Sequence, residues 1–175
     1  NWAEPHSTAP SGAPRPLVKS SQTLSKPATI SAGAMSAEQV GHARTIWQVA
    51  QRMGTGDRGA VVGIATALQE SRMINIDYGD RDSVGLFQQR PSQGWGTVEQ
   101  IMDPVYSTGK FYDGLVQVPG YTELPVTEAA QAVQRSGFPD AYAQHEPRSR
   151  AWASALTGWT PAAVDCDLDP AAGPG

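Results

Sequence analysis

The sequence contains a single cysteine, Cys166, so no disulfide can form within these 175 residues. The simplest interpretation is an unpaired thiol in a C-terminal tail. The alternative is half of a disulfide whose partner lies in another chain or in a segment outside this sequence. Asp165 and Asp167 flank the thiol and oppose formation of the thiolate, so a nucleophilic cysteine is disfavoured.

Charged residues and long apolar runs are also scarce. Charged residues make up 17% of the chain and the net charge is −4, whereas a nucleic-acid partner requires clustered Lys and Arg. No apolar run approaches the roughly 20 residues of a membrane-spanning helix. No signal peptide is visible, which suggests that the sequence starts after a cleavage site or has been trimmed. We expect a monomer that binds no nucleic acid and has no membrane-spanning segment.

Composition divides the chain into three parts. Residues 1–35 are rich in Pro, Ala, Ser and Thr and lack hydrophobic periodicity, which predicts a disordered linker. Residues 36–158 carry apolar residues at helical spacing and predict one mainly α-helical domain. Residues 159–175 return to Ala, Pro, Asp and Gly and predict a flexible tail.

Capping signals predict where the first helices begin. Ser36 and Gln39 form a capping box at the start of the first helix. Asp57 is a favourable N-cap for the second helix, which should end near residues 70–72. Thr97 and Gln100 form another capping box, which predicts a short helical turn.

In the second half of the domain, prolines predict where helices begin and end. Asp103 and Pro104 predict a helix that runs to about residue 117, with Val105, Phe111, Tyr112 and Leu115 in the core. Further helices are expected over residues 128–136 and 141–146, and Pro147 should end or kink the second of these. A last helix over residues 149–156 closes the domain.

The stretch over residues 61–89 organises the rest of the chain. Its first part is apolar on nearly every side, which predicts a buried helix, and this helix ends on Glu70. Burial disfavours the ionised form of a carboxyl group, as a general acid near neutral pH requires. A polar loop over residues 78–83 and a strand-like run over residues 84–89 predict a small β-hairpin facing Glu70. An acid on a buried helix opposite a polar hairpin suggests a cleft.

Two loop carboxylates, Asp80 and Asp82, are candidates for a second catalytic group opposite Glu70. Aspartates in loops more often form turns or pair with arginine. Asp77, Asp80 and Asp82 lack the spacing and distal glutamate of a calcium loop, and we expect no metal and no cofactor. Trp95, in a turn-rich loop, either stacks on a sugar ring or covers the core.

The same stretch resembles the catalytic segment of lysozyme-like lytic transglycosylases. In that family a Glu-Ser pair precedes Gly-Leu-Met-Gln. Here Glu70-Ser71 precedes Gly85-Leu86-Phe87-Gln88 at the spacing common in soluble members. Tyr78-Gly79-Asp80-Arg81 is also similar to the Trp-Gly-Asp-Arg of goose-type lysozymes. The matching residues span about thirty positions.

The resemblance implies a lysozyme-like helical domain that cleaves the MurNAc–GlcNAc β-1,4 bond of peptidoglycan. Glu70 would be the general acid and base, and the protein would be secreted and act in the bacterial cell wall. A further set of residues would orient Glu70 or contact the glycan. They are Ser71, Tyr78, Gln88, Gln89, Trp95 and Gln134.

Two departures from the family pattern bear on the chemistry. Goose-type lysozymes have an acid two residues after the glutamine, where this chain has Arg90, which favours transglycosylation over hydrolysis. Many transglycosylases carry Ala-Ala-Tyr-Asn-Ala-Gly on a later helix, and its tyrosine reaches the catalytic glutamate. Here Gln134 replaces the tyrosine and Arg135 the asparagine. Gln134 could still bind Glu70 or an N-acetyl group.

Three alternatives to a transglycosylase stay open. The first is a muramidase that uses Glu70 with Asp80 or Asp82. The second is a non-catalytic peptidoglycan-binding or scaffold domain that keeps the cleft without turnover. The third is a helical interaction module in which Glu70 pairs with Arg72 or Arg81.

Overall fold

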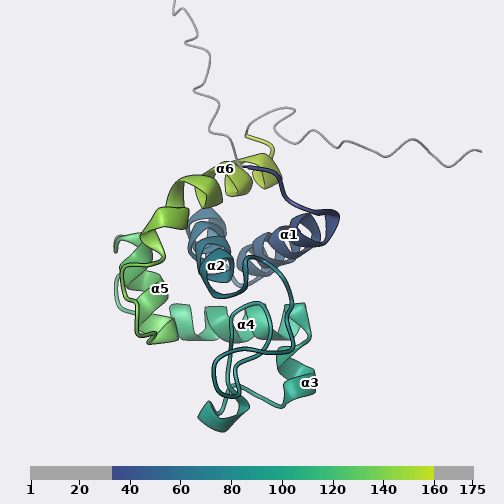
Figure 1. The fold of residues 1–175 in the computed structure, drawn as a ribbon. Helices are drawn as coiled ribbons and strands as arrows, with labels where there is room; N and C mark the ends of the chain where they lie inside the picture. Colours follow the sequence, from purple (N-terminus) through teal and green to yellow (C-terminus); the bar gives the residue numbers. More distant parts are fainter. Residues whose placement is uncertain (1–32, 160–175) are drawn as a thin grey trace, which may run out of the picture.

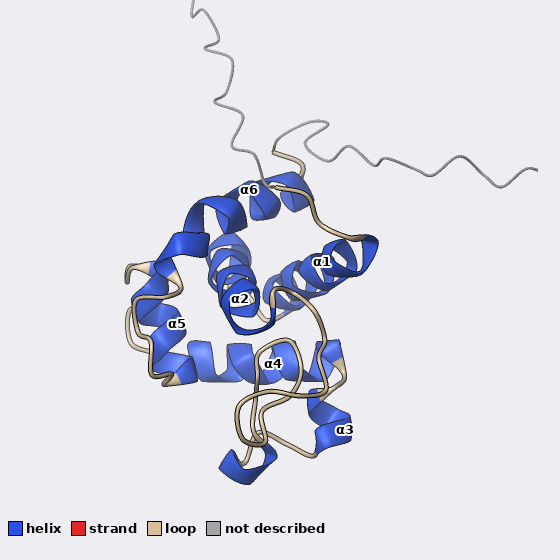
Figure 2. Ribbon diagram, viewed as in Figure 1, coloured by secondary structure: helices blue, strands red, loops and turns tan. Residues whose placement is uncertain are grey.

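The computed structural model describes residues 33–159, and the predicted linker and tail, with Cys166, lie almost entirely outside this range. The described part is mainly helical, as predicted (Figures 1 and 2). Its elements in chain order are α1 (Ala37–Arg52), α2 (Gly56–Ser71), the 3-10 turn η1 (Pro91–Gln93), α3 (Val98–Ile101), α4 (Pro104–Leu115), α5 (Val126–Gln134), the 3-10 turn η2 (Ala143–His145) and α6 (Glu146–Thr157). Within residues 33–159, no helix has both the length and the apolar character needed to cross a membrane.

Helix α2 is the centre of the domain. Figure 1 shows it surrounded by other helices, and α1, α4, α5 and α6 all pack against it. Residues 59–68 are buried without interruption, so the prediction of a core helix is confirmed. Gly63 permits this close packing, because a Cβ there would lie 2.3 Å from the hydroxyl of Tyr112 on α4. The helix therefore carries Glu70, near its C-terminus, to the edge of a dense apolar core.

The predicted helix starts are confirmed in three cases and wrong in one. Capping boxes at Ser36 and Thr97 begin α1 and α3, and Asp103 caps α4 with Pro104 in its first turn. The N-cap of α2 is Thr55 rather than Asp57. Asp57 lies in the first turn of α2 instead, where its Oδ1 accepts a hydrogen bond from Gln51 at 3.1 Å.

The later helices differ from the prediction in extent. Helix α4 ends at Leu115, and Val105 is 48% exposed rather than part of the core. Of the helix expected over residues 141–146, only the 3-10 turn η2 is formed. Pro147 stands in the first turn of α6 and so begins that helix instead of ending the one before it.

The predicted β-hairpin is not formed as such. Val84 and Gln89 make one isolated antiparallel bridge, with N···O distances of 3.0 Å and 3.1 Å, and residues 85–88 turn between them. Gly85 has φ of 81°, a left-handed conformation that favours glycine. The segment is therefore a tight loop pinned at its base, and Leu86 and Phe87 in it are fully buried.

Candidate active site

Glu70 lies in the last turn of α2 and is half-buried. The helix ends one residue later, and Arg72 adopts a left-handed conformation with φ of 55° that turns the chain away. Among residues 33–159, the ion pairs are Arg90–Asp82 and Arg150–Glu146, and neither includes Glu70. The pairing of Glu70 with Arg72 or Arg81 that would fit an interaction module is therefore wrong.

Two neutral side chains hold one oxygen of the Glu70 carboxylate. The hydroxyl of Tyr142 donates to Oε1 at 2.6 Å, and Nε2 of Gln134 donates to the same oxygen at 3.2 Å. Within the described range, Oε2 receives no hydrogen bond. The carboxylate is thus fixed by Oε1, and Oε2 is the oxygen left for proton exchange with a ligand.

Tyr142, the closer of the two donors to Glu70, was not singled out by the sequence patterns. Its side chain is fully buried just before η2. Burial, followed by the negative charge of Glu70, raises the pKa of the Tyr142 phenol well above its usual value. The phenol therefore keeps its proton and serves as a hydrogen-bond donor. The absence of a tyrosine at position 134 pointed to a donor elsewhere in the chain, but nothing in the local pattern singles out residue 142.

Gln134, the last residue of α5, connects three parts of the site. Its Nε2 donates both to Glu70 and to the main-chain oxygen of Phe87, the latter at 2.7 Å. The amide therefore ties α5 to the end of α2 and to the pinned loop. The possibility that Gln134 binds Glu70 directly is realised in the structure.

Ser71 and Gln88 position the loop. The buried hydroxyl of Ser71 lies 2.8 Å from the main-chain oxygen of Leu86, which fastens the loop to α2. Gln88 donates through Nε2 to the main-chain oxygens of Tyr78 and Gly85, at 3.2 Å and 3.1 Å. Ser71 faces the protein interior, so its contacts fit a positioning role and not direct contact with a ligand.

Both loop aspartates, which are candidates for a second catalytic carboxylate, make contacts within their own part of the chain. Asp82 accepts from Nε of Arg90 at 2.6 Å and from the backbone N–H of Ser92 at 2.8 Å. Hydrogen bonds from Ser92 and then from Arg90 hold the pKa of Asp82 well below its usual range. Asp80 is exposed, and its main-chain oxygen accepts from Ser83 in a turn. The contacts of both residues are those of loop-forming side chains, and the catalytic assignment made for them from the sequence finds no support.

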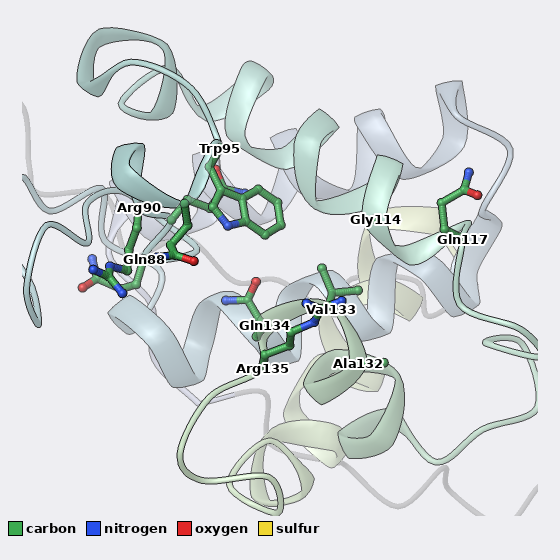
Figure 3. Close-up of a pocket in the computed structure, with 11 residues that line it drawn as sticks. Gln88, Arg90, Trp95, Gly114, Gln117, Ala132, Val133, Gln134 and Arg135 are labelled. Carbon is green, nitrogen blue, oxygen red and sulfur yellow. The ribbon is translucent and has the colours of Figure 1, made fainter.

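A cavity of about 530 Å³ lies between the α4–α5 pair and the loop after the bridge (Figure 3). Its volume is in the range typical of ligand sites. Its wall is rich in amides and also carries one indole and two guanidinium groups. The lining residues are Gln88, Gln89, Arg90, Gln93, Trp95, Gly114, Gln117, Ala132, Val133, Gln134 and Arg135. Glu70 is not on the wall itself, but its hydrogen-bond partner Gln134 is, so the cavity adjoins the carboxylate through that amide.

The remaining predicted contact residues occupy different environments. Trp95 packs against the core and also lines the cavity, so its cover over the core is confirmed and its stacking on a sugar ring stays a prediction. Gln89 lines the cavity although it is only 2% exposed, and its Nε2 donates to the main-chain oxygen of Ser107 at 2.9 Å, so its contact with a ligand stays a prediction. Tyr78 is 68% exposed on its loop and lies outside the cavity wall.

The arrangement suits proton transfer by one carboxyl group next to a polar cavity. Across residues 33–159, no three His, Cys, Asp or Glu side chains gather as metal ligands. What the geometry offers is a carboxyl oxygen free to exchange a proton, held still by a buried phenol and an amide. No known protein-family model matches the chain, and no curated protein matches it either.

Proposed function

We propose that this chain cleaves peptidoglycan at the MurNAc–GlcNAc β-1,4 bond as a lytic transglycosylase, with Glu70 as the general acid and base. The observation that carries the proposal is the immobilised carboxylate. Oε1 is held at 2.6 Å by Tyr142 and at 3.2 Å by Gln134, next to a cavity lined by amides and an indole. The resemblance of residues 70–88 to the transglycosylase segment supports the same assignment.

The reaction needs a single carboxyl group. Protonated Glu70 gives its proton from Oε2 to the glycosidic oxygen, and the bond from that oxygen to C1 of the MurNAc residue breaks. The 6-hydroxyl of the same sugar then attacks C1, and the carboxylate of Glu70 takes the proton of this hydroxyl. The products are a new 4-hydroxyl on the GlcNAc side and a 1,6-anhydro end, and the enzyme returns to its starting protonation.

The loop aspartates favour this route over hydrolysis. An inverting muramidase needs a second carboxylate about 6.5–9.5 Å from the acid, placed to activate a water molecule. Asp82 is already bound by Arg90 and Ser92, and Asp80 is exposed in a turn. Intramolecular attack by the sugar hydroxyl requires no such group.

In the transglycosylase pattern a tyrosine on the helix that corresponds to α5 reaches the catalytic glutamate, and here Tyr142 has this role. Its phenol approaches Glu70 from the segment before η2, and Gln134 occupies the position on α5 that the tyrosine would have. The donor to the carboxylate is therefore retained although its place in the chain has changed. We infer a site of action in the cell wall, outside the cytoplasm, because that is where the glycan lies.

Mass spectrometry of fragments released from purified cell walls tests the proposal. The unmodified chain should release muropeptides with 1,6-anhydro ends, and Glu70→Gln should abolish release. The amide oxygen introduced by this change still accepts from Tyr142, so the fold should be kept. Asp80→Asn is the matched control, since it also removes one carboxylate and should leave release unchanged.

The other outcomes distinguish the alternatives. Fragments with reducing ends, lost in Asp80→Asn or Asp82→Asn, would identify a muramidase instead. Sedimentation with insoluble peptidoglycan without release of any fragment would identify a glycan-binding domain. Release that survives Glu70→Gln would refute the assignment of the acid.

A further inference from the structure

The cavity beside Glu70 carries only positive charge on its wall. Arg90 and Arg135 are the charged residues among those that line it, and no aspartate or glutamate contributes. The chain as a whole has a net charge of −4. The wall is therefore opposite in sign to the molecule, and such a cavity concentrates anionic ligands over neutral ones.

The two arginines are not equivalent. The guanidinium of Arg90 is bound to Asp82 at 2.6 Å, so much of its charge is already neutralised. The guanidinium of Arg135 makes no hydrogen bond or ion pair with any other residue in the described range. Arg135 is exposed and is thus the cation that a ligand entering the cavity would meet.

The backbone places Arg135 next to the carboxylate-holding amide. Arg135 is the C-cap of α5 and adopts a left-handed conformation with φ of 50°, a position usually taken by glycine or asparagine. Figure 3 shows Gln134 and Arg135 side by side on the α5 wall, with Trp95 and Gln88 across the cavity. A group that binds Arg135 would therefore lie beside Gln134, the neighbouring residue that donates a hydrogen bond to Glu70.

We infer that Arg135 binds a carboxylate carried by the glycan, so that the substrate is an anionic strand and not a neutral chitin-like one. This inference rests on the proposed function and specifies its substrate. A guanidinium binds a carboxylate through two parallel N–H donors. The amides and the indole on the same wall match the hydroxyl, acetamido and ring faces of an amino sugar. In peptidoglycan the carboxylate comes either from the lactyl group of MurNAc or from a stem peptide attached to it.

Calorimetric titration of the full 175-residue chain carrying Glu70→Gln tests this assignment without any need for turnover. Three tetrasaccharides serve as probes. One alternates GlcNAc and MurNAc with free lactyl carboxylates, the second carries stem peptides on the lactyl groups, and the third is the neutral GlcNAc tetramer. Each probe is titrated into three proteins that all carry Glu70→Gln. One keeps Arg135, the second also carries Arg135→Gln, and the third also carries Arg135→Lys.

At least one carboxylate-bearing probe should bind about tenfold more weakly to Arg135→Gln than to the protein that keeps Arg135, because the charge-assisted contact is lost. The neutral tetramer makes no such contact and should bind equally to these two proteins. Arg135→Lys should bind with intermediate affinity, since it keeps the charge but loses the paired donors. Arg44→Gln, on the exposed side of α1, removes the same charge and should change nothing. The probe that responds identifies the source of the carboxylate.

Unchanged affinity of both anionic probes for Arg135→Gln would overturn the inference. An equal loss for the neutral tetramer would do the same, because it would show a structural role. Failure of the proposed reaction looks different. In that case the anionic probes bind through Arg135, but the chain with Glu70 intact releases no fragments.

Discussion

Removing the Tyr142 hydroxyl is the most direct test of how Glu70 is held. Tyr142→Phe keeps the buried ring and deletes the donor at 2.6 Å from Oε1, so that among residues 33–159 Gln134 at 3.2 Å is the only donor left on this oxygen. A hydrogen bond to a charged group contributes about 1.5–3 kcal/mol. If this bond maintains the reactive orientation of the carboxylate, the same energy corresponds to a fall in kcat of about 10- to 150-fold.

Tyr112→Phe is the matched control. Tyr112 is also fully buried, and its hydroxyl donates at 2.8 Å to the main-chain oxygen of Gly59, which is a neutral acceptor. We expect a loss of about 1 kcal/mol in the free energy of unfolding, typical of a neutral hydrogen bond, and an unchanged kcat. The pair of variants therefore separates a general loss of stability from a specific loss of catalysis.

The assay combines urea unfolding with the initial rate of fragment release from purified cell walls. Tyr142→Phe should lower both the stability and kcat, with little change in KM because the phenol is buried and does not face the cavity. Equal rates for Tyr142→Phe and the unmodified chain would refute the reasoning. Equal losses of kcat in the two variants would also refute it, since the effect would then come from stability alone.

Three further changes test the parts around Glu70. Ser71→Ala leaves the buried main-chain oxygen of Leu86 without its donor and should lower the free energy of unfolding by about 1–3 kcal/mol in urea titration. Gly79→Ala brings a Cβ to 2.7 Å from the main-chain oxygen of Ser83, so the loop must shift, and thermal unfolding should show a loss of about 1–3 kcal/mol. The depressed pKa of Asp82 stabilises the fold above the usual aspartate value of 3.8, and this contribution is lost as the pH falls further, so Asp82→Asn should flatten the dependence of stability on pH below that value.

Helix positions were largely predictable because local signals dictated them. The capping boxes at Ser36 and Thr97, and Asp103 before Pro104, satisfy backbone donors within one turn, so neighbouring residues suffice to recognise them. The burial of α2 followed from its apolar composition alone. At Asp57 the same reasoning failed, since Thr55 and Asp57 compete for one helix start and the turn at Gly54 and Gly56 favours the earlier residue.

The partners of Glu70 were less predictable because long-range packing sets them. Tyr142 is 72 residues away and Gln134 is 64 residues away along the chain, and no periodic pattern connects either with position 70. The contacts of Asp82 were likewise not predictable, because they depend on whether Arg90 folds back onto the loop that carries Asp82. Sequence patterns singled out Glu70, whereas the groups that hold its carboxylate could be recognised only in the tertiary structure.

The two bonds to Oε1 also have a consequence for the order of folding. Glu70 belongs to a helix that can form early from local contacts, whereas both donors arrive from the last third of the described chain. Contacts of such wide sequence separation close late, because the intervening loop must first be ordered. During refolding from urea, the helical circular dichroism signal should therefore recover before lytic activity does, and a chain cut between α4 and α5 should regain helices without a working acid.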